Sequence, residues 1–218
     1  MTAVNQVSGS RLVCIIDDDA DVRDSLASLL RASGYDVRGF GAPEEFLADD
    51  AADSAACLVL DVQLGSVNGL DFQQELLDSD TTLPVILISG HGDIPMTVRA
   101  MRAGAVTFLS KPFDDQAMLA AIDEAVARDE DRRMREREDA SLRARYECLT
   151  PRERDVLGYV AAGLMNKQIA GKLELSEITV KIHRGNMMRK MEAESLADLV
   201  RMAEALGVRE AVSRYNHG

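Results

Sequence analysis

Cysteine is rare in this sequence of 218 residues, and long hydrophobic runs are missing from it. The three cysteines, Cys14, Cys57 and Cys148, form no Cys-x-x-Cys pair, and their odd number does not indicate a disulfide framework. No apolar run approaches the roughly 18 residues that cross a membrane, and residues 1–10 lack the apolar stretch of a secretory signal. We therefore expect a cytoplasmic protein with no membrane partner.

Positive charge is also in short supply, but only in one part of the chain. The 25 basic residues against 37 acidic ones give a formal net charge of -12, which on its own argues against a nucleic-acid-binding protein. Residues 1–127 hold 7 basic and 21 acidic side chains, or -14, whereas residues 146–218 hold 11 and 10, or +1. Within the latter, residues 178–191 carry Lys and Arg but no acid. This asymmetry predicts two domains with different partners.

The first part of the chain alternates short apolar runs with helical patterns. Residues 12–16 are apolar on both faces, as in a buried strand, and residues 22–30 place apolar side chains on one side of a helix. Further strands are expected at 35–40, 57–60, 84–89 and 106–109, and helices at 43–48, 70–77, 95–102 and from 114 onward. We predict an α/β fold, a doubly wound five-stranded parallel sheet, with its functional crevice at the carboxyl ends of the strands.

A charged segment separates this sheet from a smaller all-α part. Residues 128–147 carry many charges and no heptad repeat, which favours a solvated helical linker over a coiled coil. Thr150-Pro151-Arg152-Glu153 is a capping box with proline in the first turn, so it predicts the start of a helix. Asn166 can cap a short second helix, and residues 178–191 and 196–206 predict two more. The second and third, joined by a tight turn, indicate a helix-turn-helix.

Polar side chains follow the ends of the expected strands. Asp17-Asp18-Asp19 follows the first strand, Asp61 ends the third, Ser89 ends the fourth and Lys111 follows the fifth. Carboxylates that share a crevice repel one another, and Mg²⁺, which prefers oxygen ligands and recruits phosphate oxygens, relieves that repulsion. A lysine and a hydroxyl at the same rim suit a phosphoryl group carried by a carboxylate. The alternative is that these acids gather here only because loops are solvated.

Over residues 11 to about 127, the chain resembles the receiver domain of two-component response regulators. Four runs carry the resemblance: Ile15-Ile16-Asp17-Asp18-Asp19, Leu58-Val59-Leu60-Asp61, Ile88-Ser89-Gly90-His91-Gly92-Asp93 and Phe108-Leu109-Ser110-Lys111-Pro112-Phe113. The resemblance implies a flavodoxin-like fold in which Asp61 accepts a phosphoryl group that Ser89 and Lys111 contact. It also implies a Mg²⁺ site made by Asp17, Asp18, Asp61 and the main-chain carbonyl of Gln63, with Asp18 and Asp61 as direct ligands.

Two positions near this site are unusual for the family. Gly65 stands where receivers usually have proline, so we expect a more permissive loop after Asp61 and a changed lifetime of the phosphoryl group. Phe108 stands at the aromatic switch position, which the family couples to movement of the Ser89 hydroxyl. Because Phe108 lacks the hydroxyl of tyrosine, any switch there works by packing alone. Asp19 is expected to support the loop rather than to bind metal.

Residues 149–206 resemble the LuxR-type helix-turn-helix domain, and together with a receiver they indicate the FixJ/NarL subfamily of response regulators. The runs that carry this resemblance are Leu149-Thr150-Pro151-Arg152-Glu153-Arg154, Gly163-Leu164-Met165-Asn166-Lys167-Gln168-Ile169-Ala170 and Thr179-Val180-Lys181-Ile182-His183-Arg184. At about 100° per residue, the packing face of the third helix holds Val180, His183, Met187 and Met191, and the opposite face is free for the major groove of DNA.

The resemblance implies DNA contacts by two groups of residues. Those facing the groove are Lys181, Ile182 and Gly185, and those near the DNA backbone are Lys167, Thr179, Arg184 and Asn186. Gly185 offers no side chain to read a base. His183 is expected to pack or to contact phosphate rather than to bind metal. The alternative for the basic residues is an ordinary solvated helix face.

These patterns predict a phosphorylation-controlled transcription factor and not an enzyme. A sensor histidine kinase is expected to phosphorylate Asp61, which promotes homodimerisation and binding to promoter DNA, with activation of transcription through RNA polymerase. The expected domains are a flexible N-terminus (1–10), receiver (11–127), helical linker (128–147), DNA-binding domain (148–210) and tail (211–218). Two alternatives remain: a DNA-binding protein whose acidic half is an unphosphorylated interaction module, and a metal-dependent phosphohydrolase.

Overall fold

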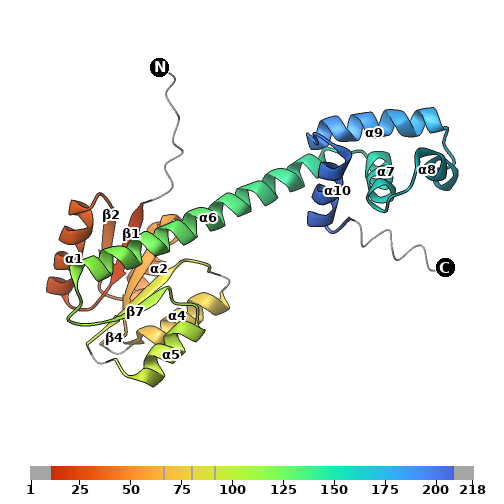
Figure 1. Ribbon diagram of the computed structural model, residues 1–218. Helices are drawn as coiled ribbons and strands as arrows, with labels where there is room; N and C mark the ends of the chain where they lie inside the picture. The colour runs from red at the N-terminus through yellow and green to blue at the C-terminus, as the bar shows by residue number, and fades with distance from the viewer. Residues whose placement is uncertain (1–10, 66, 80, 91, 209–218) are drawn as a thin grey trace, which may run out of the picture. The chain divides into compact units, whose positions relative to one another are not determined.

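The structure is a computed structural model that describes residues 11–65, 67–79, 81–90 and 92–208 (Figure 1). The N-terminus predicted over 1–10 and the tail predicted over 211–218 lie outside the described residues, as do Ser66 and His91 of the motifs. The chain divides into two compact units, Met1–Arg133 and Met134–Gly218.

A five-stranded sheet with the order β2-β1-β3-β6-β7 forms the centre of the first unit. Its strands are β1 (Leu12–Ile16), β2 (Asp36–Phe40), β3 (Cys57–Asp61), β6 (Val85–Ser89) and β7 (Thr107–Ser110), and all neighbours are parallel. β3 and β6 are buried along their whole length, which explains why their sequences are apolar on both faces. The strand order reverses between β1 and β3, where sheets of this kind hold their ligands. The predicted doubly wound fold is confirmed.

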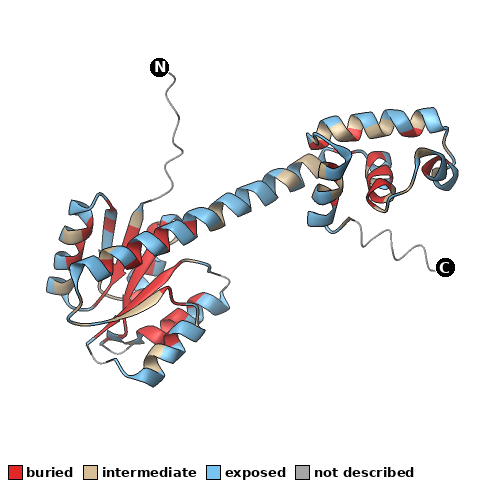
Figure 2. Cartoon of the chain, in the orientation of Figure 1, coloured by how far each residue is buried: buried red, intermediate tan, exposed pale blue. Residues whose placement is uncertain are grey.

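Helices cover both faces of the sheet and create two cores. The first core joins α1 (Ala20–Ala32) and α6 (Asp115–Glu147) to one face of the sheet. The second joins α2 (Pro43–Leu47), α3 (Ala51–Ser54), α4 (Gly69–Asp78) and α5 (Ile94–Arg102) to the other. Buried residues accordingly concentrate on the strands and on the inner sides of these helices (Figure 2).

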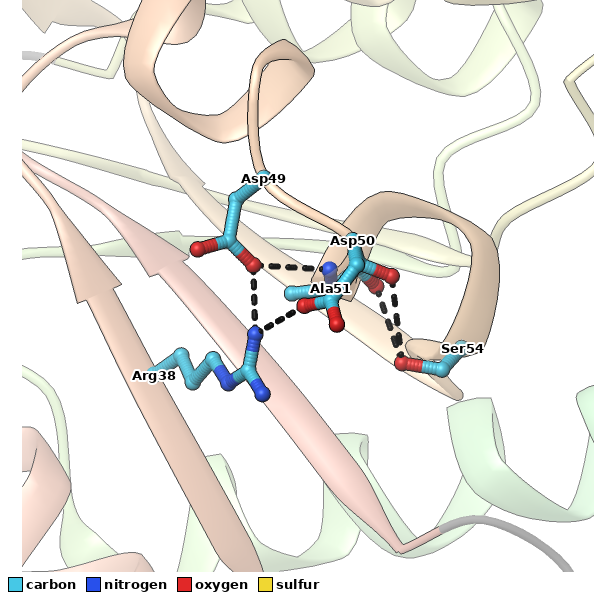
Figure 3. A network of polar contacts seen from close by, with 5 residues as sticks. All are labelled: Arg38, Asp49, Asp50, Ala51 and Ser54. Atoms are coloured by element: carbon cyan, nitrogen blue, oxygen red, sulfur yellow. Dashed lines mark hydrogen bonds and ion pairs between the residues drawn. The ribbon is translucent and has the colours of Figure 1, made fainter.

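Two short elements are not predicted by the sequence patterns. One is the hairpin of β4 (Gln63–Leu64) and β5 (Val67–Asn68), and the other is α3. The start of α3 depends on side chains: Asp49 Oδ1 accepts a hydrogen bond from the backbone N–H of Ala51 at 2.7 Å, and Arg38 pairs with both Asp49 and Asp50 (Figure 3). Such short elements have no periodicity that a pattern could reveal.

The segment predicted as a linker belongs to one continuous helix, α6, of 33 residues. Arg133 donates a hydrogen bond to the main-chain oxygen of Ala55 at 2.7 Å and pairs with the buried Asp129, so this part of α6 packs in the first unit. Further along, Leu142 and Tyr146 pack against the core of the second unit. The division between the units, at Arg133 and Met134, therefore falls inside α6.

The second unit consists of the end of α6 and of α7 (Pro151–Ala161), α8 (Asn166–Leu173), α9 (Glu177–Met191) and α10 (Leu196–Ala205). The predicted capping box forms, because Thr150 N donates to Glu153 Oε2 at 2.9 Å and Glu153 N donates to Thr150 Oγ1 at 3.3 Å. The predicted cap by Asn166 is wrong: Met165 is the N-cap of α8, and its N–H donates to Gln168 Oε1 at 2.8 Å.

The second unit also has its own core, built from Leu149, Val156, Leu157, Val160, Ala161, Ile169, Ala170, Val180, Met187, Met191, Leu199 and Ala203. Across both units, none of the helices within the described residues is both long enough and apolar enough to cross a membrane.

Candidate functional site

The carboxyl ends of four strands, β1, β3, β6 and β7, open onto one cavity of about 620 Å³. Asp17 follows β1, Asp61 ends β3 and Lys111 follows β7, so the parallel strands bring these three side chains together as the sequence predicts. The cavity is lined by Asp17, Asp18, Asp19, Asp61, Val62, Gln63, Gly65, Val67, Asn68, Gly90 and Lys111.

Three carboxylates meet in this cavity. Asp17, Asp18 and Asp61 each place one oxygen within 4.8 Å of the others. Asp17 and Asp61 are buried, whereas Asp18 is exposed at the rim. Among the described residues, the only cation near the buried Oδ1 of Asp61 is the ammonium group of Lys111, at 3.4 Å. Three carboxylate oxygens at this spacing fit a hard divalent cation such as Mg²⁺.

Lys111 supplies a positive charge to these carboxylates. Its Nζ donates a hydrogen bond to Asp17 Oδ2 at 2.7 Å and lies 3.4 Å from Asp61 Oδ1. Burial alone would lower the pKa of Lys111, but the hydrogen bond to Asp17 and the charge of Asp61 outweigh it and raise that pKa above its ordinary value. Lys111 therefore stays protonated at neutral pH and offsets part of the repulsion.

The environment of Asp61 disfavours its charged form. Burial raises the pKa of Asp61, and the neighbouring charge of Asp17 raises it further. Lys111 and a hydrogen bond from the backbone of Gln63 act in the opposite direction, but the net pKa lies above the usual value. A cation or a group that removes negative charge from this carboxylate would relieve the cost of its burial.

Asp19 and Arg23 hold the loop that presents the first two carboxylates. Asp19 Oδ1 accepts a hydrogen bond from Asp21 N at 2.9 Å, which caps α1, and Asp19 N donates to Asp17 Oδ1 at 3.0 Å. Arg23 Nη1 donates to the main-chain oxygen of Asp17 at 2.5 Å. The role of Arg23 was not predicted. Arg23 bonds a main-chain oxygen, so no residue type at the other end of the bond could have revealed its role.

Gly69, a second residue that the sequence patterns did not identify, lets α4 begin directly against Asp61. A Cβ atom at Gly69 would lie 2.1 Å from the main-chain oxygen of Asp61 and 3.1 Å from Cα of Val62. Gly69 N also donates a hydrogen bond to Val62 O at 2.9 Å. No side chain fits in this space, so only glycine permits this approach. A glycine as the first residue of a helix, directly after the Asn68 cap, was the available signal.

The loop after Asp61 has a conformation that suits glycine and not proline. Gly65 has φ of +57°, whereas the ring of proline fixes φ near -65°. Gln63, on the same loop, is exposed and pairs with Asn68 in the hairpin of β4 and β5. Proline at position 65 could not adopt this loop conformation, whereas Gly65 can.

The two predicted switch residues lie on neighbouring strands. Ser89 is fully buried at the end of β6, and Gly90 after it lines the cavity. Phe108 is half-buried in β7, opposite Leu87 of β6. A Cβ atom at Gly92 would lie 2.9 Å from the ring of Phe108, so Gly92 packs against that ring.

In the second unit, α8 and α9 form a helix-turn-helix. Glu174 ends α8 in the left-handed region with φ of 55°, and Ser176 caps α9 by accepting a hydrogen bond from Thr179 N at 3.1 Å. Val180, Met187 and Met191 are fully buried against the other helices. The opposite face of α9 is exposed (Figure 2).

The predicted DNA contacts divide into exposed and internally bonded residues. The exposed ones are Lys167, Lys181, Ile182 and Gly185. The half-buried ones already have partners in the unit: Thr179 bonds Ser176, Arg184 Nη1 donates to Asn166 Oδ1 at 2.8 Å, and Asn186 Oδ1 accepts from Arg189 at 3.2 Å. His183 is half-buried. Arg184 thus ties α9 to the start of α8, which the sequence did not predict.

The first unit has an acidic cavity with a lysine at the switch point of a doubly wound sheet, and the second unit has a helix-turn-helix. This combination defines the class of DNA-binding response regulators of two-component systems. Comparison with known proteins agrees. The family described as "Response regulator receiver domain" matches residues 13–123, and "Bacterial regulatory proteins, luxR family" matches residues 147–203.

Relatives of the whole chain belong to the same class. Nodulation protein W of Bradyrhizobium diazoefficiens is 51% identical over 203 residues, covering 93% of this chain and 89% of the relative. Transcriptional regulatory protein FixJ of Rhizobium meliloti is 44% identical over 200 residues, covering 89% and 96%. The solved structure of response regulator StyR is 43% identical with a TM-score of 0.81, covering 88% and 98%. This chain belongs to the FixJ-type response regulators, with a receiver and a LuxR-type DNA-binding domain.

Proposed function

We propose that Asp61 is the phosphoacceptor of this response regulator and that a sensor histidine kinase is the donor. The observation that carries this proposal is the Asp61 carboxylate, which lines the cavity with Lys111 Nζ 3.4 Å from its Oδ1 and the carboxylates of Asp17 and Asp18 beside it. An oxygen of Asp61 forms a bond to phosphorus while the bond from phosphorus to the kinase histidine nitrogen breaks. The product is an acyl phosphate on Asp61.

Side chains around Asp61 have separate roles in this reaction. Lys111, kept cationic by Asp17, contacts a phosphoryl oxygen, and Asp19 and Arg23 keep the first two carboxylates in place. Asp17, Asp18, Asp61 and the main-chain carbonyl of Gln63 would hold Mg²⁺, with Asp18 and Asp61 as direct ligands. When bound, Mg²⁺ supplies positive charge that offsets the charge of the carboxylates and of the phosphoryl oxygens.

We propose that phosphorylation of Asp61 changes the surface around α5 through movements of Ser89 and Phe108. Ser89 would turn its hydroxyl toward a phosphoryl oxygen, and Gly92, which packs on Phe108, would move with it. The nearby α5 carries three exposed apolar side chains one turn apart, Ile94, Val98 and Met101, which are 82%, 43% and 48% exposed. A stripe of this kind on a helix surface suits contact with a second copy of the chain.

Dimerisation would couple two DNA-binding units. We propose residues 11–127 as the receiver, 128–147 as the helical linker and 148–210 as the DNA-binding domain. Residues 146–218 have a net charge of only +1, so each unit is expected to bind DNA weakly, and joining two raises the effective concentration of the second. The dimer would bind promoter DNA and activate transcription with RNA polymerase as its partner.

The experiment measures dimerisation and DNA binding with and without beryllofluoride and Mg²⁺. Sedimentation should show a monomer that dimerises when both are added. The Asp61→Asn variant should not respond, whereas Asp53→Asn, which changes an exposed acid on α3, should respond like the wild type. A chain that binds DNA equally with and without the phosphoryl analogue would instead indicate an unphosphorylated interaction module.

A further inference from the structure

The recognition helix α9 exposes two large apolar side chains on one face. Ile178 is 73% exposed and Ile182 is 59% exposed. At about 100° per residue, these two isoleucines, four residues apart, lie within about 40° of each other around the helix axis. The buried Val180, Met187 and Met191 occupy the opposite side. The helix is therefore apolar on both faces, although only one of them packs within the unit.

The surroundings of these isoleucines indicate the chemistry of what covers them. Lys181 lies about 60° to one side of Ile178 around the helix axis, Arg189 lies on the exposed face itself, and residues 178–191 contain no acidic side chain. Gly185 continues the same face, and a Cβ atom placed there would meet nothing within 4 Å. This surface combines apolar side chains with cations, and at Gly185 the helix can approach its target closely. Such a surface is complementary to a polyanion that also carries apolar groups.

We propose that Ile178 and Ile182 recognise the 5-methyl groups of thymine in the major groove. This inference rests on the proposed DNA-binding function and adds the base that the helix reads. The thymine methyl is the apolar group that a base pair presents in the major groove, and the other base edges there present hydrogen-bond donors and acceptors. An isoleucine placed against those polar edges would leave them unpaired, so thymine is the base that both side chains favour.

The test uses the full chain with beryllofluoride and Mg²⁺ to select duplexes from a random DNA library. A selected duplex is then made again with uracil, which lacks the 5-methyl group, in place of each thymine in turn. Binding should weaken about fourfold for each methyl that an isoleucine covers, the loss expected for one buried carbon. The Ile182→Ala variant should bind the thymine and uracil duplexes equally at its position, and Ile178→Ala likewise at another.

Lys181→Ala is the matched control, because it should weaken binding to thymine and uracil duplexes alike. Both isoleucines are exposed, so their alanine variants should melt at the wild-type temperature. If the wild-type chain binds every uracil duplex as tightly as the thymine duplex, the inference is overturned. The proposed DNA-binding function would still stand in that case. Loss of beryllofluoride-dependent dimerisation in either isoleucine variant would assign the stripe to a protein contact and would also overturn it. Failure to select any DNA would contradict the proposed function itself.

Discussion

The substitution Gly69→Ala tests how closely α4 must approach the proposed phosphoacceptor. The new methyl would lie 2.1 Å from the main-chain oxygen of Asp61, whereas carbon and oxygen normally stay about 3.3 Å apart. Either the start of α4 or the Asp61 backbone must therefore shift by about 1 Å. Overpacking of this kind costs about 1–3 kcal/mol of stability. A displacement of about 1 Å in a reacting group lowers the rate about a hundredfold.

The assay is Mg²⁺-dependent labelling by a small acyl phosphate, followed as the rate of protein phosphorylation. We expect Gly69→Ala to be labelled about a hundredfold more slowly while remaining folded by circular dichroism. The matched control is Gly41→Ala, whose Cβ would meet Glu45 Oε2 at 3.6 Å, an ordinary contact, and which should be labelled at the wild-type rate. A wild-type rate for Gly69→Ala would refute the proposed link between this close approach and the reactivity of Asp61.

Two further substitutions test charges in the two units. Lys111→Met removes a cation that lies 2.7 Å from Asp17 and 3.4 Å from Asp61, so Mg²⁺ should bind about fivefold more tightly in calorimetry while beryllofluoride no longer causes dimerisation. Burial opposes ionisation of Glu153, but hydrogen bonds from Lys190 and Thr150 outweigh it and lower the pKa of Glu153. The resulting stability is present above the unfolded-state pKa of about 4.3 and is lost as pH falls below it. Glu153→Gln should lower the free energy of unfolding by about 2 kcal/mol at pH 7 and should flatten this acid-side decline in chemical denaturation.

Much of the fold could be predicted because the strands are buried on both faces. β1, β3 and β6 are continuous apolar runs, and the polar residues that end them mark the edge at which the site forms. The capping box at Thr150 also formed as its sequence indicates. The capping box depends on local sequence alone. The arrangement of the strands is predictable because the rules for connecting parallel strands leave few possible topologies.

Other parts of the site depend on contacts that are distant in sequence or on main-chain geometry. Arg23 bonds a main-chain oxygen, and Gly69 acts through the absence of a side chain, so neither carries a motif. Asn166 has the residue type of a helix cap, but its amide oxygen is bound by Arg184, eighteen residues away, and Gln168 completes the start of α8 instead. An asparagine side chain can cap a helix or bond a distant side chain, and the residue type alone does not say which of these hydrogen bonds forms.

The central claim is that Asp61 carries the phosphoryl group. The most direct measurement is Mg²⁺-dependent labelling by an acyl phosphate of the wild type and of Asp61→Asn, followed by identification of the labelled peptide. The account predicts one alkali-labile label on the peptide that contains Asp61, and no label on the variant. A label of equal yield on Asp61→Asn, or on a peptide from elsewhere in the wild-type chain, would contradict it.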